Sequence, residues 1–411
     1  MNTASPKLED AVHELACEKI DQSENETFGS SPLLTRLTEL GTELWIDTGD
    51  LHLARSIWKQ ELTSLTTNNT LANQVVQTGV MDDMIRKTAS RLRNIVSDIS
   101  EKDLVMEVGF VINCRIALRL VQAFHKKVSV ELHPAVSRDI ERTVYYGRRY
   151  FRVCPDYFNV KVPLTPEGYL AVRKLRKENI PINFTLGFSA RQNYLAARLS
   201  NPDYVNVFLG RLNQVVSDNS CGSGKYVGEK VTWATQKVLW SLRKIENSIS
   251  SHLIGASIRN GEQLVSLAGI DVLTVPPKAI REFLDSSDNN IVSGSEIDWK
   301  PEITSGFEKF QILWEVSRSF QEFVDDLVSS NDIDRFGSED LLRVINKHGI
   351  NLFYPFSEND LRKIYDQGKI PKLVNWPEKI ALDDLMTTSA LNSFAKDQRT
   401  LDNRIRSLLG F

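Results

Sequence analysis

The stretch "YFNVKVPLTPEGYLAVRKL", residues 157–175, predicts a β-strand that turns directly into a helix. Successive side chains of the strand point to opposite faces, with Phe158, Val160 and Val162 on one face and Asn159, Lys161 and Pro163 on the other. Thr165 can cap the helix, with Pro166 as the first helical residue. Since desolvation disfavours a charged amine, a lysine that faces the interior of a fold needs a reason to be there.

The strand-then-helix pattern of this stretch recurs along most of the chain. Ser189, for example, can cap a helix that follows another short apolar run. Alternating strands and helices are typical of parallel α/β folds, and eight such units predict a (β/α)8 TIM barrel. The predicted strands lie at residues 43–50, 62–68, 128–132, 158–163, 182–188, 204–210, 251–257 and 272–277.

The chain divides into three predicted parts. Residues 1–30 form a polar N-terminal arm, with one amphipathic helix on Leu8, Val12 and Leu15. Residues 31–290 form the catalytic barrel, and residues 291–411 form a helical C-terminal extension. The polar stretch 285–306 is expected to be a linker or loop between the last two parts.

Composition excludes several classes of protein. The net charge is −3 and no long block of one sign occurs, so we expect neither a nucleic-acid surface nor a membrane surface. No apolar run is long enough to span a bilayer, and the acidic N-terminus has no secretory pattern, which predicts a soluble, cytoplasmic protein. Cysteine and histidine spacings fit neither a disulfide framework nor a metal site.

Strand alternation gathers polar side chains on the inward face and at the carboxyl ends of the predicted strands. Barrel interiors normally hold branched apolar side chains, so such a polar set indicates a site. A desolvated lysine amine is a nucleophile toward carbonyl carbon, and an imine makes cleavage of a neighbouring C–C bond feasible. The candidate site residues are Asp47, Asn68, Glu131, Lys161, Asn183, Thr185, Asn206, Phe208, Arg211, Ser257 and Arg259.

These motifs resemble the transaldolase family, a group of Schiff-base-forming sugar-phosphate enzymes with a (β/α) barrel. "WIDTGD" is similar to the family's "ADTGD", "LTTNNTL" to "TTNPSL", "VSVEL" to "VSxEV" and "VKVPLTPEG" to "IKVPATPEG". "INFTLGFS", "VFLGRL" and "IGASIRN" resemble later motifs in the same order, and "FAKDQRTLDNRI" resembles the family's last helix.

The resemblance implies catalytic roles for four residues. Lys161 would form the Schiff base, and Asp47 would take and return the proton of the hydroxyl beyond the scissile bond. Glu131, through a water and with Thr185 nearby, would move protons while the imine forms. The implied reaction moves a dihydroxyacetone unit from fructose 6-phosphate or sedoheptulose 7-phosphate to an aldose phosphate, in the pentose phosphate pathway of carbohydrate metabolism, without metal or cofactor.

The resemblance also implies the residues that bind the substrate. Asn68 and Asn183 would hold the dihydroxyacetone fragment, and Phe208 would be an apolar wall without a hydroxyl to assist hydrolysis. The substrate phosphate would be held by Arg211, Ser257 and Arg259. The implied partners are sugar phosphates only, and the chain is expected to be a monomer or a homodimer.

Two alternatives stay open. The related fructose-6-phosphate aldolases release free dihydroxyacetone, but they lack the carboxylate that resembles Glu131. A barrel that has lost turnover and acts as a binding or regulatory scaffold is the other reading, since Asn206 replaces the family's serine. Asn69 replaces a proline in the second motif, which predicts a looser turn there.

Overall fold

Eight parallel strands close into a barrel in the order β1-β2-β3-β4-β5-β6-β7-β8, which confirms the predicted (β/α)8 fold. The structure is a computed structural model and describes residues 6–20, 27–286 and 291–411. The strands are β1 Glu43–Asp47, β2 Leu62–Thr66, β3 Lys127–Glu131, β4 Phe158–Pro163, β5 Ile182–Thr185, β6 Tyr204–Phe208, β7 His252–Ala256 and β8 Val272–Val275.

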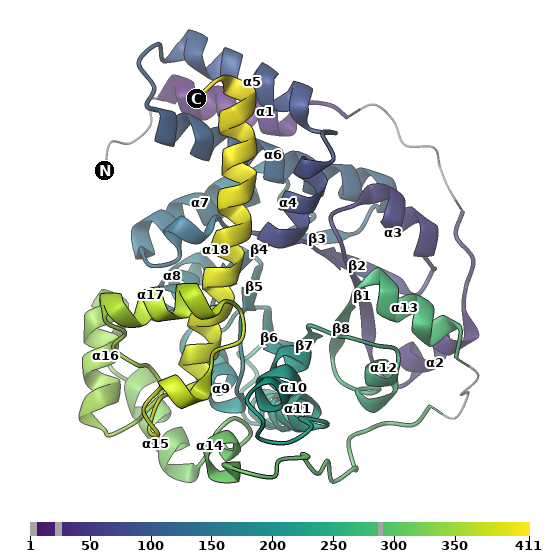
Figure 1. Ribbon diagram of the computed structural model, residues 1–411, viewed down its shortest axis with the longest axis vertical. Coiled ribbons are helices and arrows are strands. Elements are labelled where there is room, and N and C mark those ends of the chain that lie inside the picture. Colours follow the sequence, from purple (N-terminus) through teal and green to yellow (C-terminus); the bar gives the residue numbers. More distant parts are fainter. Residues whose placement is uncertain (1–5, 21–26, 287–290) are drawn as a thin grey trace.

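Helices surround the barrel and continue beyond its last strand (Figure 1). Those up to the end of the barrel are α1 Pro6–Cys17, α2 Pro32–Glu39, α3 Leu51–Ile57, α4 Asn69–Gln77, α5 Asp82–Ile95, α6 Glu101–Phe124, η1 Pro134–Val136, α7 Ile140–Val153, α8 Pro166–Lys177, α9 Ala190–Leu199, α10 Leu209–Asp218, α11 Val227–Ile245, α12 Glu262–Ser266 and α13 Pro277–Leu284. The later ones are α14 Phe307–Gln311, α15 Arg318–Val328, η2 Ile333–Arg335, α16 Ser338–Lys347, α17 Glu358–Gln367, η3 Leu373–Asn375 and α18 Leu382–Leu409.

The two helix caps predicted from the sequence are confirmed. The Thr165 hydroxyl accepts a hydrogen bond from Gly168 N at 2.9 Å and donates to Ser137 O at 2.7 Å. The Ser189 hydroxyl accepts from Gln192 N at 3.1 Å at the start of α9. Each cap satisfies a backbone N–H that the first helical turn leaves without a partner, and so fixes where the helix leaves the barrel mouth.

Aromatic packing fills the end of the barrel interior where the strands begin. The rings of Trp45 on β1 and Tyr204 on β6 meet edge to face, with centroids 4.7 Å apart. Because β1 and β6 are not neighbours in the sheet, this contact crosses the barrel. The predicted inward direction of Trp45 is therefore correct, and the polar groups are left to the other end of the strands.

Three polar residues on the inward face of neighbouring strands are aligned by the strand register. Glu131 on β3 pairs with Lys161 on β4, and Lys161 pairs with Asn183 on β5. Since neighbouring strands lie about 4.8 Å apart, these side chains meet at one level of the barrel. Parallel pairing of adjacent strands thus brings an acid, an amine and an amide together from residues far apart in sequence.

The strand pattern was extended too far at two predicted positions. β6 ends at Phe208, and Arg211 lies in the first turn of α10. β7 ends at Ala256, and Ser257 has a left-handed backbone with φ of 63°. The two-residue alternation therefore does not decide where Arg211 and Ser257 point, because the chain has left the sheet before either residue.

The extension is helical, as predicted, and returns to the barrel through its last helix. Figure 1 shows α18 in yellow, running from the region of α15 and α17 to α5 and α1. Along this path α18 contacts α4, α6 and α5, and its closest association is with α4. Asn69 of α4 donates to Gln398 Oε1 at 3.0 Å, so α18 is tied to the loop after β2.

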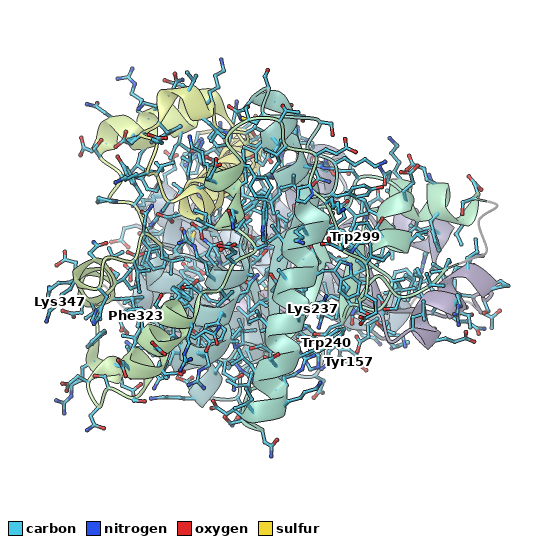
Figure 2. All side chains as sticks on the ribbon, turned by 90° about the horizontal axis from the view of Figure 1, so that it is seen from below. Tyr157, Lys237, Trp240, Trp299, Phe323 and Lys347 are labelled. Carbon is cyan, nitrogen blue, oxygen red and sulfur yellow. The ribbon has the colours of Figure 1, made fainter. Side chains whose placement is uncertain are left out.

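The regions at the two ends of the barrel domain also pack on it. In α1 the predicted residues Leu8, Val12 and Leu15 are buried, and the helix contacts α5, α6 and α7. Figure 2 shows Trp299 beside α11, where the Lys230 Nζ to Asp298 Oδ1 distance is 3.2 Å. Parts of the predicted arm and of the predicted 285–306 linker, residues 1–5, 21–26 and 287–290, lie outside the described residues.

Removal of the Thr165 cap tests this account of the β4 to α8 turn. We expect Thr165→Val to lower the free energy of unfolding by about 1–2 kcal/mol, since Gly168 N and Ser137 O both lose a buried partner. Thr165→Ser keeps the hydroxyl and is the matched control. An unchanged urea midpoint for Thr165→Val would contradict the assignment of the cap.

Candidate active site

A cavity of about 300 Å³ opens at the carboxyl ends of the strands, where the sequence predicted a site. The predicted residues that line it are Asp47, Asn68, Lys161, Asn206, Phe208, Arg211, Ser257 and Arg259. Glu131, Asn183 and Thr185 do not line the cavity, but they contact its lining residues from behind. The structure therefore brings together residues from β1, β3, β4, β5 and β6 and from the segments that follow β2, β6 and β7.

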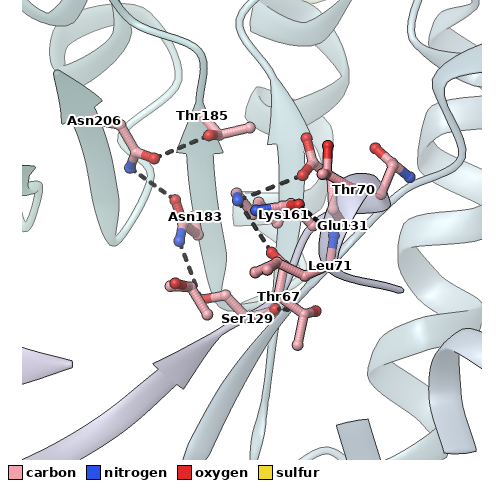
Figure 3. A network of polar contacts seen from close by, with 12 residues as sticks. Thr67, Thr70, Leu71, Ser129, Glu131, Lys161, Asn183, Thr185 and Asn206 are labelled. Atoms are coloured by element: carbon pink, nitrogen blue, oxygen red, sulfur yellow. Dashed lines mark hydrogen bonds and ion pairs between the residues drawn. The ribbon is translucent and has the colours of Figure 1, made fainter. Parts of the chain in front are cut away.

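The amine of Lys161 is shielded from solvent. Its side chain is 5% exposed, and Nζ donates a hydrogen bond to Thr67 O at 3.1 Å. Nζ also lies 3.4 Å from Glu131 Oε2, the contact drawn in Figure 3. An amine with one carbonyl and one carboxylate as neighbours is held at a fixed place while its end faces the cavity.

Glu131 is buried more deeply than the lysine, with 1% of its side chain exposed. Burial raises the pKa of this carboxyl to about 7, against the attraction of the neighbouring Lys161. Neither carboxylate oxygen accepts a hydrogen bond with good geometry from the described protein groups. A carboxyl with such a pKa can take up or release a proton near neutral pH, as a proton carrier must.

Asp47 lies at the end of β1 and is held by two threonines. The Thr66 hydroxyl donates to Asp47 Oδ1 at 2.6 Å, and the hydroxyls of Thr66 and Thr274 are also 2.6 Å apart. Desolvation raises the pKa of the Asp47 carboxyl, while Lys161 and the Thr66 hydrogen bond act in the opposite direction. Asp47 is thus a second oriented acid on the wall of the same cavity.

A chain of amides and hydroxyls crosses β3, β5 and β6 behind the cavity (Figure 3). Asn183 Nδ2 donates to the Ser129 hydroxyl at 3.0 Å, and Asn206 Nδ2 donates to Asn183 Oδ1 at 2.8 Å. The Thr185 hydroxyl donates to Asn206 Oδ1 at 2.9 Å. Both ends of Asn206 are therefore used inside the protein, and its amide spans a gap that a serine side chain is too short to bridge.

The two asparagines after β2 both make hydrogen bonds inside the protein. Asn68 caps α4, because its Oδ1 accepts from Leu71 N at 2.9 Å, and its Nδ2 donor remains for the cavity that it lines. Asn69, for which the sequence predicts a looser turn, donates through Nδ2 to Gln398 Oε1 of α18 at 3.0 Å. A tertiary contact therefore stands where the family has a proline ring.

Positive charge gathers at one side of the cavity mouth. Arg211 is 7% exposed, and its Nε and Nη1 are buried without a hydrogen-bond partner among the described residues. Desolvation, followed by repulsion from Arg259, lowers the pKa of Arg211 to about 10. Gly210 allows this crowding, since a Cβ there would lie 2.2 Å from Ser257 O and 2.6 Å from Arg259 Cγ.

Sequence reasoning missed the part of the site that comes from the extension. Phe394 of α18 covers Arg211, whose guanidinium carbon is 6.0 Å from the Phe394 ring centroid and 5.8 Å from that of Phe208. Asp397, which accepts a hydrogen bond from Thr70, and Lys369, before η3, also line the cavity. The similarity of the last helix to the family's motif predicted a helix, but it could not predict what this helix covers.

Another cavity, of about 520 Å³, lies on the extension, and it has no comparable chemistry. It is lined by surface carboxylates such as Glu315, Glu322 and Asp326, and its cation Arg191 is already paired with Asp383 at 2.7 Å. No group of described His, Cys, Asp and Glu side chains is arranged to hold a metal ion. Among the described helices, none has the length and apolar character to cross a membrane.

Comparison with known proteins gives a consistent result. The family model for "Transaldolase/Fructose-6-phosphate aldolase" matches residues 44–334. A probable transaldolase from Exiguobacterium sibiricum is 32% identical over 182 residues, which is 44% of this chain and 71% of that protein. A transaldolase from Kluyveromyces lactis is 29% identical over 273 residues, covering 62% and 76% of the two chains. One from Prochlorococcus marinus is 28% identical over 272 residues, covering 63% and 77%.

The titration of Glu131 tests the electrostatics of the site. We expect Lys161→Met to raise the pKa of Glu131 above about 7, because the attraction that lowers it is lost while desolvation remains. The carboxyl C=O band in pH-difference infrared spectra would report the change, with Glu131→Gln to identify the band. A pKa that falls in Lys161→Met would contradict the pairing.

Proposed function

Because the chain belongs to the transaldolase and fructose-6-phosphate aldolase family, we propose that it is a transaldolase that acts through a Schiff base on Lys161. It transfers a dihydroxyacetone unit from fructose 6-phosphate or sedoheptulose 7-phosphate to an aldose phosphate. The observation that carries this proposal is the shielded Lys161 amine, 3.4 Å from the Glu131 carboxyl in a cavity that also presents Asp47.

The first half of the reaction joins the ketose to the lysine. The neutral Lys161 amine attacks the C2 carbonyl, and the resulting carbinolamine loses water to give an imine. Loss of water needs a proton on the departing hydroxyl, and Glu131, with a pKa of about 7, supplies it at neutral pH. A water between Glu131 and Thr185 completes the path, as the resemblance implied.

The second half breaks and remakes a C–C bond. Asp47 takes the proton of the C4 hydroxyl, the C3–C4 bond breaks, and its electron pair moves into the imine to give an enamine on Lys161. The aldose phosphate leaves with its new carbonyl. An acceptor aldose phosphate then adds to the enamine, Asp47 returns the proton, and water releases the product from the lysine.

Binding of the substrate divides between the two sides of the cavity. On the side of the amine, Asn68 holds the hydroxyls of the dihydroxyacetone fragment, and Asn183, which does not line the cavity, positions the Asn206 amide that does. At the mouth, the phosphate is held by Arg211, Ser257 and Arg259, whose donors suit a doubly charged anion. The buried guanidinium of Arg211, which has two nitrogens without partners, supports this assignment. We further propose that the enzyme acts in the cytoplasmic pentose phosphate pathway as a monomer or homodimer.

A fructose-6-phosphate aldolase is the second candidate, because the family model includes both activities. The two activities differ in the fate of the enamine. In the aldolase it is protonated and released as dihydroxyacetone, and in the transaldolase it stays bound until an acceptor adds to it. Glu131 and Phe208 favour transfer, since the ring of Phe208 places no hydroxyl at the cavity wall. A scaffold without turnover is the third candidate. Its only support is Asn206, which replaces the family's serine.

Reductive trapping tests the Schiff base. We expect incubation with fructose 6-phosphate and borohydride to attach a dihydroxyacetone-derived group to Lys161, detected by peptide mass spectrometry. Lys161→Met should prevent the adduct. Glu131→Gln, which keeps the shape of the side chain but cannot carry the proton, should slow its formation. Asp47→Asn should still trap the intact ketose, because imine formation precedes the step that needs Asp47.

The outcome of trapping separates an enzyme from a scaffold. Labelling of a different lysine, or no labelling under conditions that bind the sugar phosphate, would contradict the proposed mechanism. The position of the adduct is decisive because Lys161 is more shielded than the surface lysines that reagents label at random.

Release of free dihydroxyacetone distinguishes the two enzyme activities. We expect little free dihydroxyacetone from fructose 6-phosphate alone, and steady turnover once erythrose 4-phosphate is added as acceptor. The physical reason is that the enamine needs an electrophile in a cavity from which bulk water is largely excluded. Steady release of dihydroxyacetone without an acceptor would favour the aldolase.

A further inference from the structure

A third cation stands beside the two arginines of the proposed phosphate site. Lys369 lines the same cavity as Arg211 and Arg259, although it comes from the extension, between α17 and η3. Desolvation lowers the pKa of Lys369, with repulsion from Arg259 and Arg211 as the next causes. Both arginines therefore disfavour the charge of Lys369, and Arg259 also disfavours that of Arg211.

The segment that carries Lys369 is fastened to the helix that carries Arg211. Asn219, the C-cap of α10, donates through Nδ2 to Pro371 O at 3.0 Å and accepts through Oδ1 from Leu373 N at 2.7 Å. Arg211 lies in the first turn of the same α10. One side chain thus ties the backbone two to four residues after the exposed Lys369 to the helix of Arg211.

No ion pair within the described residues accounts for the three cations. Within the described residues, Arg211, Arg259 and Lys369 form no ion pair, and the carboxylates that act on Lys369 from a distance are Asp218 and Asp397. Asp397 is already bound to Thr70. Buried guanidinium groups are normally paired, so a mutually repelling set that faces a cavity indicates a site for an anion.

We propose that Lys369 is a third phosphate-binding residue, supplied by the C-terminal extension, which makes the site selective for phosphorylated over unphosphorylated aldehydes. This inference rests on the proposed function, in which Arg211, Ser257 and Arg259 hold the phosphate. A phosphate dianion relieves the repulsion among the three cations, and the gain is largest when all three are present. The extension is then part of the substrate site.

Binding of a substrate analogue that cannot react tests the proposal apart from catalysis. Glucitol 6-phosphate has the phosphate but no carbonyl, so it forms no imine with Lys161. We expect Lys369→Met to raise its Kd, and that of inorganic phosphate, about five- to tenfold in calorimetry. Lys369→Arg should retain binding, because it keeps the charge.

Lys372 provides the matched control. It lies on the same fastened segment, it is exposed, and it does not line the cavity. Lys372→Met changes the net charge by the same amount and should leave both Kd values unchanged. An equal loss of affinity in Lys372→Met and Lys369→Met would show that only the net charge of the protein matters, and it would overturn the proposal.

Kinetics give an independent reading. With glyceraldehyde 3-phosphate as acceptor, Lys369→Met should raise KM about five- to tenfold and leave kcat near its original value. With unphosphorylated glyceraldehyde as acceptor and fructose 6-phosphate at a saturating concentration, the KM for the acceptor should match that of the unaltered enzyme, because this acceptor brings no phosphate to Lys369. A change in kcat with both acceptors would indicate a structural effect and contradict the proposal.

Failure of this inference is distinguishable from failure of the proposed function. If glucitol 6-phosphate binds in a manner that depends on Lys369 but no dihydroxyacetone is transferred, the phosphate site stands and the transaldolase proposal falls. If transfer occurs and Lys369→Met binds and reacts as the unaltered chain does, the role of Lys369 is refuted. Absence of any phosphate binding by the unaltered chain also refutes it.

Discussion

The contact between Lys161 and Glu131 is the constraint on which the rest of the site depends. Each group is nearly excluded from solvent, and a buried charge without a partner is costly to a fold. Removing one partner of such a pair typically destabilises a protein by about 3–5 kcal/mol. The two residues are therefore fixed where neighbouring strands align them, and no flexible loop is required to bring them together.

The same geometry explains why the cations stand apart from the amine. Lys161 and Glu131 lie on β4 and β3, whereas Arg211, Ser257 and Arg259 follow β6 and β7. A closed barrel separates these groups across its mouth, so a ligand must reach from one side to the other. A phosphorylated sugar chain has this form, with its carbonyl near one end and its phosphate at the other. In the proposed function, the width of the barrel mouth therefore sets the distance between the carbonyl that reacts and the phosphate that is bound.

The sequence predicted what depends on local chemistry. The caps Thr165 and Ser189 were found because a hydroxyl next to the first helical turn has few other uses, and Lys161 was found because alternation is reliable within a strand. The predicted strand ends, though not the place of the residues beside them on the cavity wall, were wrong where that regularity stops. Ser257 and Arg211 lie just past strand ends, where the backbone turns into a left-handed residue or a helix. Lys369, Phe394 and Asp397 were missed because only tertiary packing brings the extension to the mouth.

The departures from the family pattern are partly explained by contacts that a single sequence cannot show. Asn69 lacks the rigidity of a proline, yet its amide reaches Gln398 and thereby holds α18 across the mouth. Asn206 is larger than a serine, and its two ends join Asn183 to Thr185. The Asn69 amide thus gains a hydrogen bond to the extension, whereas the Asn206 amide gains two to the neighbouring strand β5. The first contact holds the extension beside the cavity that Phe394 and Asp397 line, and the second holds the barrel wall behind the same cavity.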